Sequence, residues 1–128
     1  MPHYHISLVG GQPMPVYQGL IHANPEKVLL ICSDKTYKDA EGIKNELKGV
    51  DLEIIEFDPV NLEVIQKQID KMKNKIPVDA TLSVNITGGT KPWSIMFYND
   101  FIQKNRPQYF TLIKITYFGT LLMEQMQF

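Results

Sequence analysis

Cysteine is nearly absent from this sequence. The 128 residues contain one, Cys32, so an intramolecular disulfide is excluded. It lies in the apolar run from Val28 to Cys32, which predicts a buried structural thiol in a reducing compartment. No apolar run approaches membrane-spanning length, and the N-terminus lacks the charged and apolar regions of a signal peptide. We therefore expect a cytoplasmic protein that contacts no membrane.

An excess of charge of either sign is also lacking. Thirteen basic residues against fourteen acidic ones leave a net charge of −1, so nothing draws the chain toward long nucleic acid, and any anion must be bound locally. The spacing of a Walker A loop and the pattern Gly-x-Gly-x-x-Gly are both missing, which removes the usual support for ATPase and dinucleotide functions. The length predicts a single domain over residues 1–128.

Hydrophobic periodicity alternates between strand and helix along the chain. Strands are expected over residues 3–9, 27–32, 52–57, 81–86, 109–117 and 121–126, and helices over 16–23, 37–48, 62–76 and 91–106. This order predicts an α/β fold, a Rossmann-like and mainly parallel sheet with helices on both faces and a C-terminal β-hairpin.

One stretch, Asn85 to Pro92, changes from strand to helix pattern at a glycine pair. Thr90 can cap the helix that follows, and Pro92 falls in its first turn, where a missing N–H costs little. Free backbone amides at such a start, with glycines that let a ligand approach, suit an anionic oxygen, and Lys91 adds a positive charge. The alternative is a tight turn beside a solvated lysine.

A second glycine pair, Gly10-Gly11, follows the first expected strand. If the strand order is 3-2-1-4-5, the first and fourth strands are neighbours where the winding reverses, which is where ligands bind in such sheets. Both glycine pairs would then meet at one phosphate or nucleotide site. Ser33, Asp34 and Thr36, after the second strand, would form its rim.

Two loops carry a resemblance to a known family. Asn85 to Lys91, together with Leu8 to Pro13, resembles the CARF (CRISPR-associated Rossmann fold) domain, above all the N-terminal sensor of type III CRISPR nuclease effectors. The order of elements extends the likeness over nearly the whole chain, although no nuclease domain follows. The site residues that the resemblance implies are Gly10, Gly11, Gln12, Pro13, Ser33, Asp34, Thr36, Thr87, Gly88, Gly89, Thr90 and Lys91.

The resemblance implies a homodimer that binds a cyclic oligoadenylate, most often cyclic tetra-adenylate, across its two-fold axis, without metal or cofactor. Such a sensor would be fused to a nuclease effector or work beside one. The amides of Gly88, Gly89 and Thr90 and the Lys91 side chain would hold phosphates, and the rim residues would face ribose or adenine. Thr87 and Thr90 have a second interpretation, in which they only end the strand and cap the helix.

Other functions remain open at this point. A stand-alone ring nuclease would use Lys91 and backbone amides to stabilise charge while a ribose 2′-hydroxyl attacks the adjacent phosphate, although no general base is evident. A Rossmann-like domain for an ordinary mononucleotide is a further alternative. The glycine pairs could also be turns without a ligand.

Two more groups of polar residues have structural interpretations. His3 and His5 share a strand face, but no third metal ligand is near, so we expect surface or rim histidines. Lys67, Lys71, Lys73 and Lys75 surround an amphipathic helix pattern and are expected to form a solvated face rather than a nucleic-acid patch.

Overall fold

The computed structural model describes residues 2–12, 14, 16–17, 20, 24–104, 112–116 and 124–127. The strands are β1 (His3–Leu8), β2 (Lys27–Cys32), β3 (Asp51–Glu56), β4 (Thr81–Asn85), β5 (Leu112–Thr116) and β6 (Glu124–Gln127). The helices are α2 (Tyr37–Glu46), α3 (Leu62–Lys73) and α4 (Lys91–Tyr98), and α4 continues into a π-helical segment, η1 (Asn99–Lys104).

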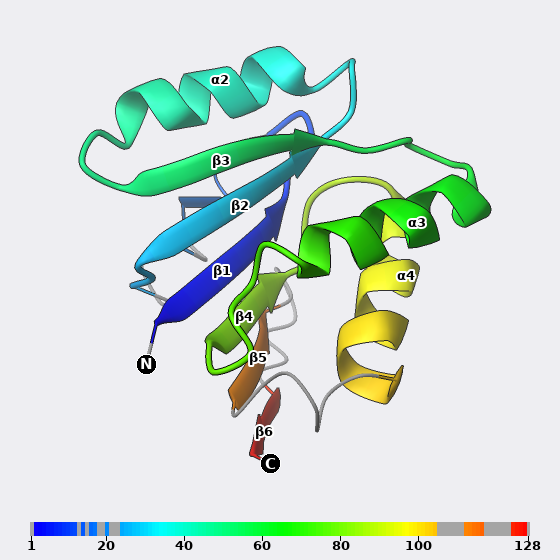
Figure 1. Ribbon diagram of the computed structural model, residues 1–128. Helices are drawn as coiled ribbons and strands as arrows, with labels where there is room; N and C mark the ends of the chain where they lie inside the picture. The colour runs from blue at the N-terminus through cyan, green and yellow to red at the C-terminus, as the bar shows by residue number, and fades with distance from the viewer. Residues whose placement is uncertain are drawn as a thin grey trace.

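The strands form one sheet in the order β3-β2-β1-β4-β5-β6 (Figure 1). The first five run parallel, and β6 pairs antiparallel with β5, as expected for the closing hairpin. In register, β1 places Leu8 beside Ile31 of β2 and Ser7 beside Asn85 of β4. The winding therefore reverses between β1 and β4, as the sequence predicted.

Helices cover both faces of the sheet (Figure 1). The residues of β2 alternate between the faces: Val28, Leu30 and Cys32 pack in a cluster with α2, whereas Leu29 and Ile31 pack in a second cluster with α3 and α4. All five side chains are fully buried, which explains the uninterrupted apolar run. The predicted fold class is confirmed.

The end of α4 differs from the expectation. The pattern predicted one helix to residue 106, but α4 gives way to η1 at Asn99. Asp100 in η1 is 1% exposed, forms an ion pair with Lys73 and accepts a hydrogen bond from Gln66 Nε2 at 3.0 Å. Lys73 was expected on a solvated face, and this was wrong because the buried carboxylate holds it against η1.

His5 is buried, contrary to the surface or rim position expected for it, whereas His3 is half-buried. His5 is 1% exposed, and its Nδ1 lies 2.6 Å from Ser83 Oγ. The half-buried His3 contacts the same hydroxyl through Nε2 at 3.0 Å and Thr81 Oγ1 through Nδ1 at 2.6 Å. Burial is possible because hydroxyl groups of the neighbouring strand contact the imidazoles. Within the described part of the chain, no three metal-binding side chains come together.

Some expectations fall outside the described residues, among them most of the short helix over 16–23 and the turn at 118–120. Among the described helices, none has the length and apolar character needed to cross a membrane.

Candidate ligand site at the ends of the central strands

The two glycine corners meet at the carboxyl ends of β1 and β4. A Cβ on Gly10 would lie 3.1 Å from the amide nitrogen of Gly89. A Cβ on Gly88 would overlap the carbonyl oxygen of Leu8 and lie 3.0 Å from the Gly10 nitrogen. The overlap with Leu8 requires glycine at position 88, whereas the contacts of 3.0 and 3.1 Å are tighter than ordinary Cβ contacts. Two loops 78 positions apart in the sequence therefore form one surface.

The β4–α4 corner is fixed by its own side chains. Asn85 Oδ1 accepts a hydrogen bond from the Thr87 amide at 3.0 Å, and Thr90 Oγ1 accepts one from the Trp93 amide at 3.3 Å. Ser94 Oγ donates to the carbonyl oxygen of Ile86 at 3.0 Å. The expectation that Thr90 caps α4 is confirmed. These bonds hold the loop between strand and helix at three points.

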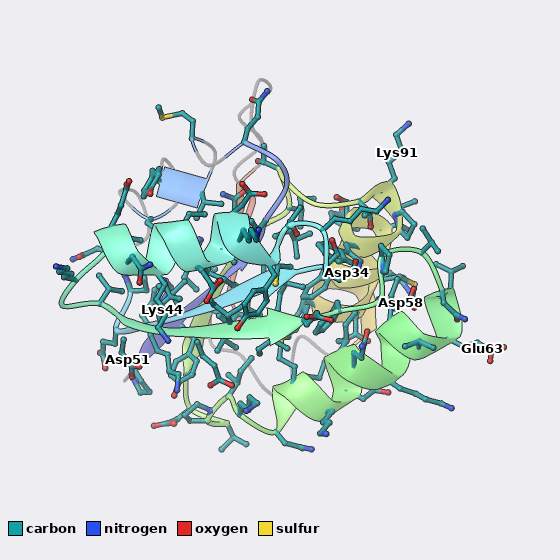
Figure 2. All side chains as sticks on the ribbon, turned by 90° about the horizontal axis from the view of Figure 1, so that it is seen from above. Asp34, Lys44, Asp51, Asp58, Glu63 and Lys91 are labelled. Carbon is teal, nitrogen blue, oxygen red and sulfur yellow. The ribbon has the colours of Figure 1, made fainter. Side chains whose placement is uncertain are left out.

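The amides between these fixed points have no hydrogen-bond acceptor among the described residues. Among the described residues, the backbone N–H groups of Gly88, Gly89 and Thr90 donate no hydrogen bond. Lys91 is the first residue of α4, is exposed, and its side chain forms no ion pair within the same set of residues. Its side chain projects outward from the start of α4 (Figure 2). A helix start with free amides and an adjacent cation is suited to an anion.

The β1 loop beside it is open. Gly11 and Gln12 are exposed, and a Cβ on Gly11 would meet no atom within 4 Å. Pro13 lies outside the described residues. A side chain at position 10 would thus crowd the Gly89 backbone, whereas one at position 11 would face open space.

The three residues expected at the rim, Ser33, Asp34 and Thr36, lie in the turn between β2 and α2. Ser33 is buried, its amide donates to Thr36 Oγ1 at 2.9 Å, and the two hydroxyl oxygens are 3.3 Å apart. Asp34 is exposed, and its Oδ1 accepts a hydrogen bond from the Lys35 amide at 2.9 Å. Ser33 and Thr36 therefore maintain the turn, and Asp34 presents a carboxylate to solvent.

A cavity of about 490 Å³ lies at the ends of β2 and β3. Its lining residues are Asp34, Lys35, Glu56, Phe57, Asp58, Pro59, Val64 and Gln68. Amides of Asn61 and Val60 donate to Asp58 Oδ1 at 2.7 and 2.9 Å, and these bonds lower the pKa of this carboxyl below its usual value. The sequence pattern marks Asp58-Pro59 only as the end of the expected strand over 52–57 and gives no sign of this lining.

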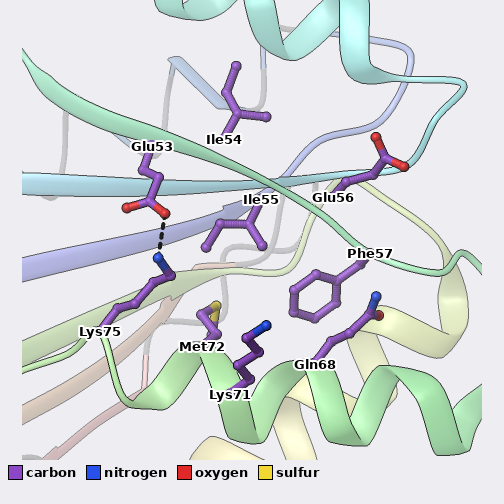
Figure 3. Close-up of a pocket in the computed structure, with 9 residues that line it drawn as sticks. All are labelled: Glu53, Ile54, Ile55, Glu56, Phe57, Gln68, Lys71, Met72 and Lys75. Atoms are coloured by element: carbon purple, nitrogen blue, oxygen red, sulfur yellow. Dashed lines mark ion pairs between the residues drawn. The ribbon is translucent and has the colours of Figure 1, made fainter.

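A second cavity, of about 390 Å³, lies between β3 and α3 (Figure 3). At one end Glu53 pairs with Lys75 at 2.8 Å, and this hydrogen bond lowers the pKa of Glu53. Its apolar lining comes from Ile54, Ile55, Phe57 and Met72. None of the glycine-corner residues lines it.

Trp93 is one of the apolar residues that recur at helical spacing in the expected helix over 91–106. Its side chain is 1% exposed, as such a pattern predicts, and its Nε1 donates to the carbonyl oxygen of Asp58 at 2.6 Å. The acceptor is a backbone atom, so no residue type in the sequence signals this bond. It links the glycine loop to the β3–α3 corner.

An open, doubly wound α/β domain with loops of two central strands meeting at its switch point is a ligand-binding class of fold. The chain belongs to the Card1 CARF domain family, whose model matches residues 4–127. The resemblance inferred from the two loops is thereby confirmed.

Two solved structures share the fold. One, described as a type III CRISPR defence DNA nuclease activated by cyclic oligoadenylate, superposes with a TM-score of 0.68 at 16% identity, covering 99% of this chain and 21% of that one. The other, Can2 from Sulfobacillus thermosulfidooxidans in complex with cyclic tetra-adenylate, has a TM-score of 0.72 at 17% identity, covering 95% of this chain and 36% of that one. The chain thus spans about a fifth to a third of these proteins. No curated protein matches the sequence.

Proposed function

We propose that this domain senses a cyclic oligoadenylate, with cyclic tetra-adenylate as the first candidate, at the carboxyl ends of β1 and β4. The observation that carries the proposal is the close approach of Gly10 to Gly88 and Gly89 at the switch point. Membership of the Card1 CARF domain family and the ligands named for the two similar structures support the same ligand class.

Phosphates of the ring would sit on the amides of Gly88, Gly89 and Thr90. The helix start supplies a partial positive charge and Lys91 a full one, so a local site can hold an anion on a protein of net charge −1. Thr90 Oγ1 already accepts a bond from the Trp93 amide, but its hydroxyl proton is still available to a phosphate oxygen. We assign no cofactor and no metal to this recognition.

The uncharged parts of the ligand would lie toward the rim. Gln12 is exposed on the β1 loop and Asp34 on the β2–α2 turn. The Gln12 amide can donate hydrogen bonds to ribose or adenine and accept them, and the Asp34 carboxylate can accept them. Ser33 and Thr36 would act indirectly, by holding the turn that presents Asp34. Negative charge at Asp34 disfavours a phosphate there, which orients the ring.

A homodimer would complete the site. A ring of four adenylates has two-fold symmetry, so two copies can each offer the same loops to half of it. In type III CRISPR defence such a domain would report the ring to a nuclease effector, fused to it or separate. The two similar structures are three to five times longer than the portion matched here, which is consistent with a sensor attached to further domains.

The test is a titration with cyclic tri-, tetra- and hexa-adenylate, read by thermal shift and by native mass. We expect one ring size to raise the melting temperature and to give a mass of two chains plus one ring. Binding of AMP or a dinucleotide to a monomer, in preference to any ring, would support the mononucleotide alternative and overturn the proposal. Incubating labelled ring with excess protein tests ring cleavage, and intact ring after hours would exclude it.

A further inference from the structure

Trp93 connects the glycine loop with the neighbouring β3–α3 corner. Its backbone amide donates to Thr90 Oγ1 at 3.3 Å, and its indole Nε1 donates to the carbonyl oxygen of Asp58 at 2.6 Å. The side chain is 1% exposed, and both bonds are partly buried. A buried indole with a satisfied N–H has one favoured orientation.

The indole also determines where Gly89 lies. A Cβ on Gly89 would be 2.5 Å from Trp93 Cε3 and 3.1 Å from Cζ3, so the ring occupies the space that a side chain would need. Gly89 has φ of +78°, a conformation that favours glycine. Because interiors are close-packed, a shift of the indole would move the Gly89 backbone with it.

The other end of this link is firmly held. Asp58 Oδ1 accepts two amides of the following turn, the Asp58 amide donates to Gln68 Oε1 at 3.0 Å, and Asn61 caps α3. Phe57 packs edge-on against the indole, with ring centroids 6.4 Å apart and planes at 83°. The β3–α3 corner is therefore a fixed anchor for the indole.

We infer that Trp93 is a positioning residue for the candidate site: anchored at Asp58, it holds Gly89 so that the loop amides are arranged before the ligand arrives. The inference rests on the proposed function for its ligand. Trp93 acts through Gly89, since its burial prevents direct contact with a ligand. A loop already in its bound conformation loses less entropy on binding, which raises affinity.

The test compares Trp93→Phe, which keeps a ring and removes the N–H, with Ile43→Val in α2. Ile43 is 1% exposed and belongs to the core cluster on the opposite face, so it serves as a stability control. Two quantities are measured: affinity for cyclic tetra-adenylate, and amide hydrogen exchange at residues 58–61 and 87–90 in the free protein. We expect Trp93→Phe to lower affinity about three- to tenfold and to accelerate exchange at both segments.

Ile43→Val should leave affinity and both segments unchanged. Equal effects of the two variants, after correction for melting temperature, would show that Trp93 is merely structural and overturn the inference. If Trp93→Phe fails to fold, replacing Trp93 with 3-benzothienylalanine keeps the bicyclic shape without the donor. If the unmodified protein binds no ring, the proposed function fails, and exchange at 87–90 alone decides the inference: rates equal to the control would reject it.

Discussion

The Cα of Gly88 faces the carbonyl oxygen of Leu8 so closely that no side chain fits between them. This contact joins β4 to β1 just beyond their last paired residues, Asn85 and Ser7. The candidate site therefore depends on a backbone packing contact as well as on the ligand-facing groups. Substitutions can separate these two requirements.

Gly88→Ala should destabilise the protein by about 2 kcal/mol or more, because its Cβ meets rigid backbone at Leu8 and Gly10 rather than a flexible side chain. Denaturant unfolding measures the loss. Gly42→Ala is the control, because Gly42 lies inside α2 with open space around it. It should be stabilising by about 0.5 to 1 kcal/mol. A Gly88→Ala protein as stable as the parent would contradict the close packing of the corners.

Gly11→Ala should leave the fold unchanged and weaken ligand binding. Nothing lies within 4 Å of the added methyl, so the free energy of unfolding should change by less than about 0.5 kcal/mol. A ligand seated over the corner would meet the methyl group, and calorimetry with the ring should then show a loss of affinity. Unchanged affinity would place the ligand away from the β1 loop.

Lys91→Ala should reduce ring affinity about 10- to 100-fold, which is the range for losing a hydrogen bond to a charged group. The melting temperature should hardly change, since Lys91 is exposed at the first position of α4. Lys67→Ala, at an exposed position of α3, is the matched control and should bind normally. Calorimetry at two salt concentrations measures both variants, and equal affinities would remove Lys91 from the site.

Most of the fold followed from periodicity, and the location of the candidate site followed from topology. The apolar run of β2 and the glycine pairs after β1 and β4 are local signals, and right-handed crossovers left few strand orders. The cap at Thr90 was also predictable from a local signal, because capping depends on residues three positions apart.

The errors concern contacts between distant segments. The pairing of Lys73 with Asp100 depends on the change from α4 to η1, which no local pattern marks. His5 is buried because Ser83 lies opposite it in the register of β1 and β4. The Trp93 indole donates to a backbone carbonyl oxygen, that of Asp58, so no residue type in the sequence predicts this bond.

Acid should weaken the β3–α3 corner. The pKa of Asp58 is lowered in the folded chain by the amides of Asn61 and Val60, so its stabilising contribution is present above the ordinary value of 3.8 and is lost as pH falls through the lower folded value. Asp58→Asn keeps an oxygen acceptor without a titrating charge. Its melting temperature should fall less than that of the parent between about pH 5 and about pH 2.

The pKa of Glu53 is also lowered, by Lys75, so this carboxyl adds a loss of the same sign on acidification. The Glu53→Gln variant measures how much of the loss of stability in acid comes from Glu53. Parallel melting curves for the parent and Asp58→Asn over this range would show that the Asp58 carboxylate does not support the corner.

Cys32 should be unreactive in the native protein. Burial, with a smaller effect from the Glu56 charge, raises the pKa of its thiol to about 11, which leaves about one thiol in a thousand ionised at pH 8. Alkylation, measured by intact-protein mass, should therefore be slow in the native protein, because it requires opening of the fold, and rapid in denaturant.

The raised pKa of Cys32 also affects the pH dependence of stability. Stabilisation from the neutral thiol is complete below the unfolded value of 9.0 and is lost as pH rises toward 11, so Cys32→Ala should flatten the alkaline side of the stability profile. Fast labelling of the folded protein would mean that β2 opens to solvent, which its position between two helix-covered faces does not allow.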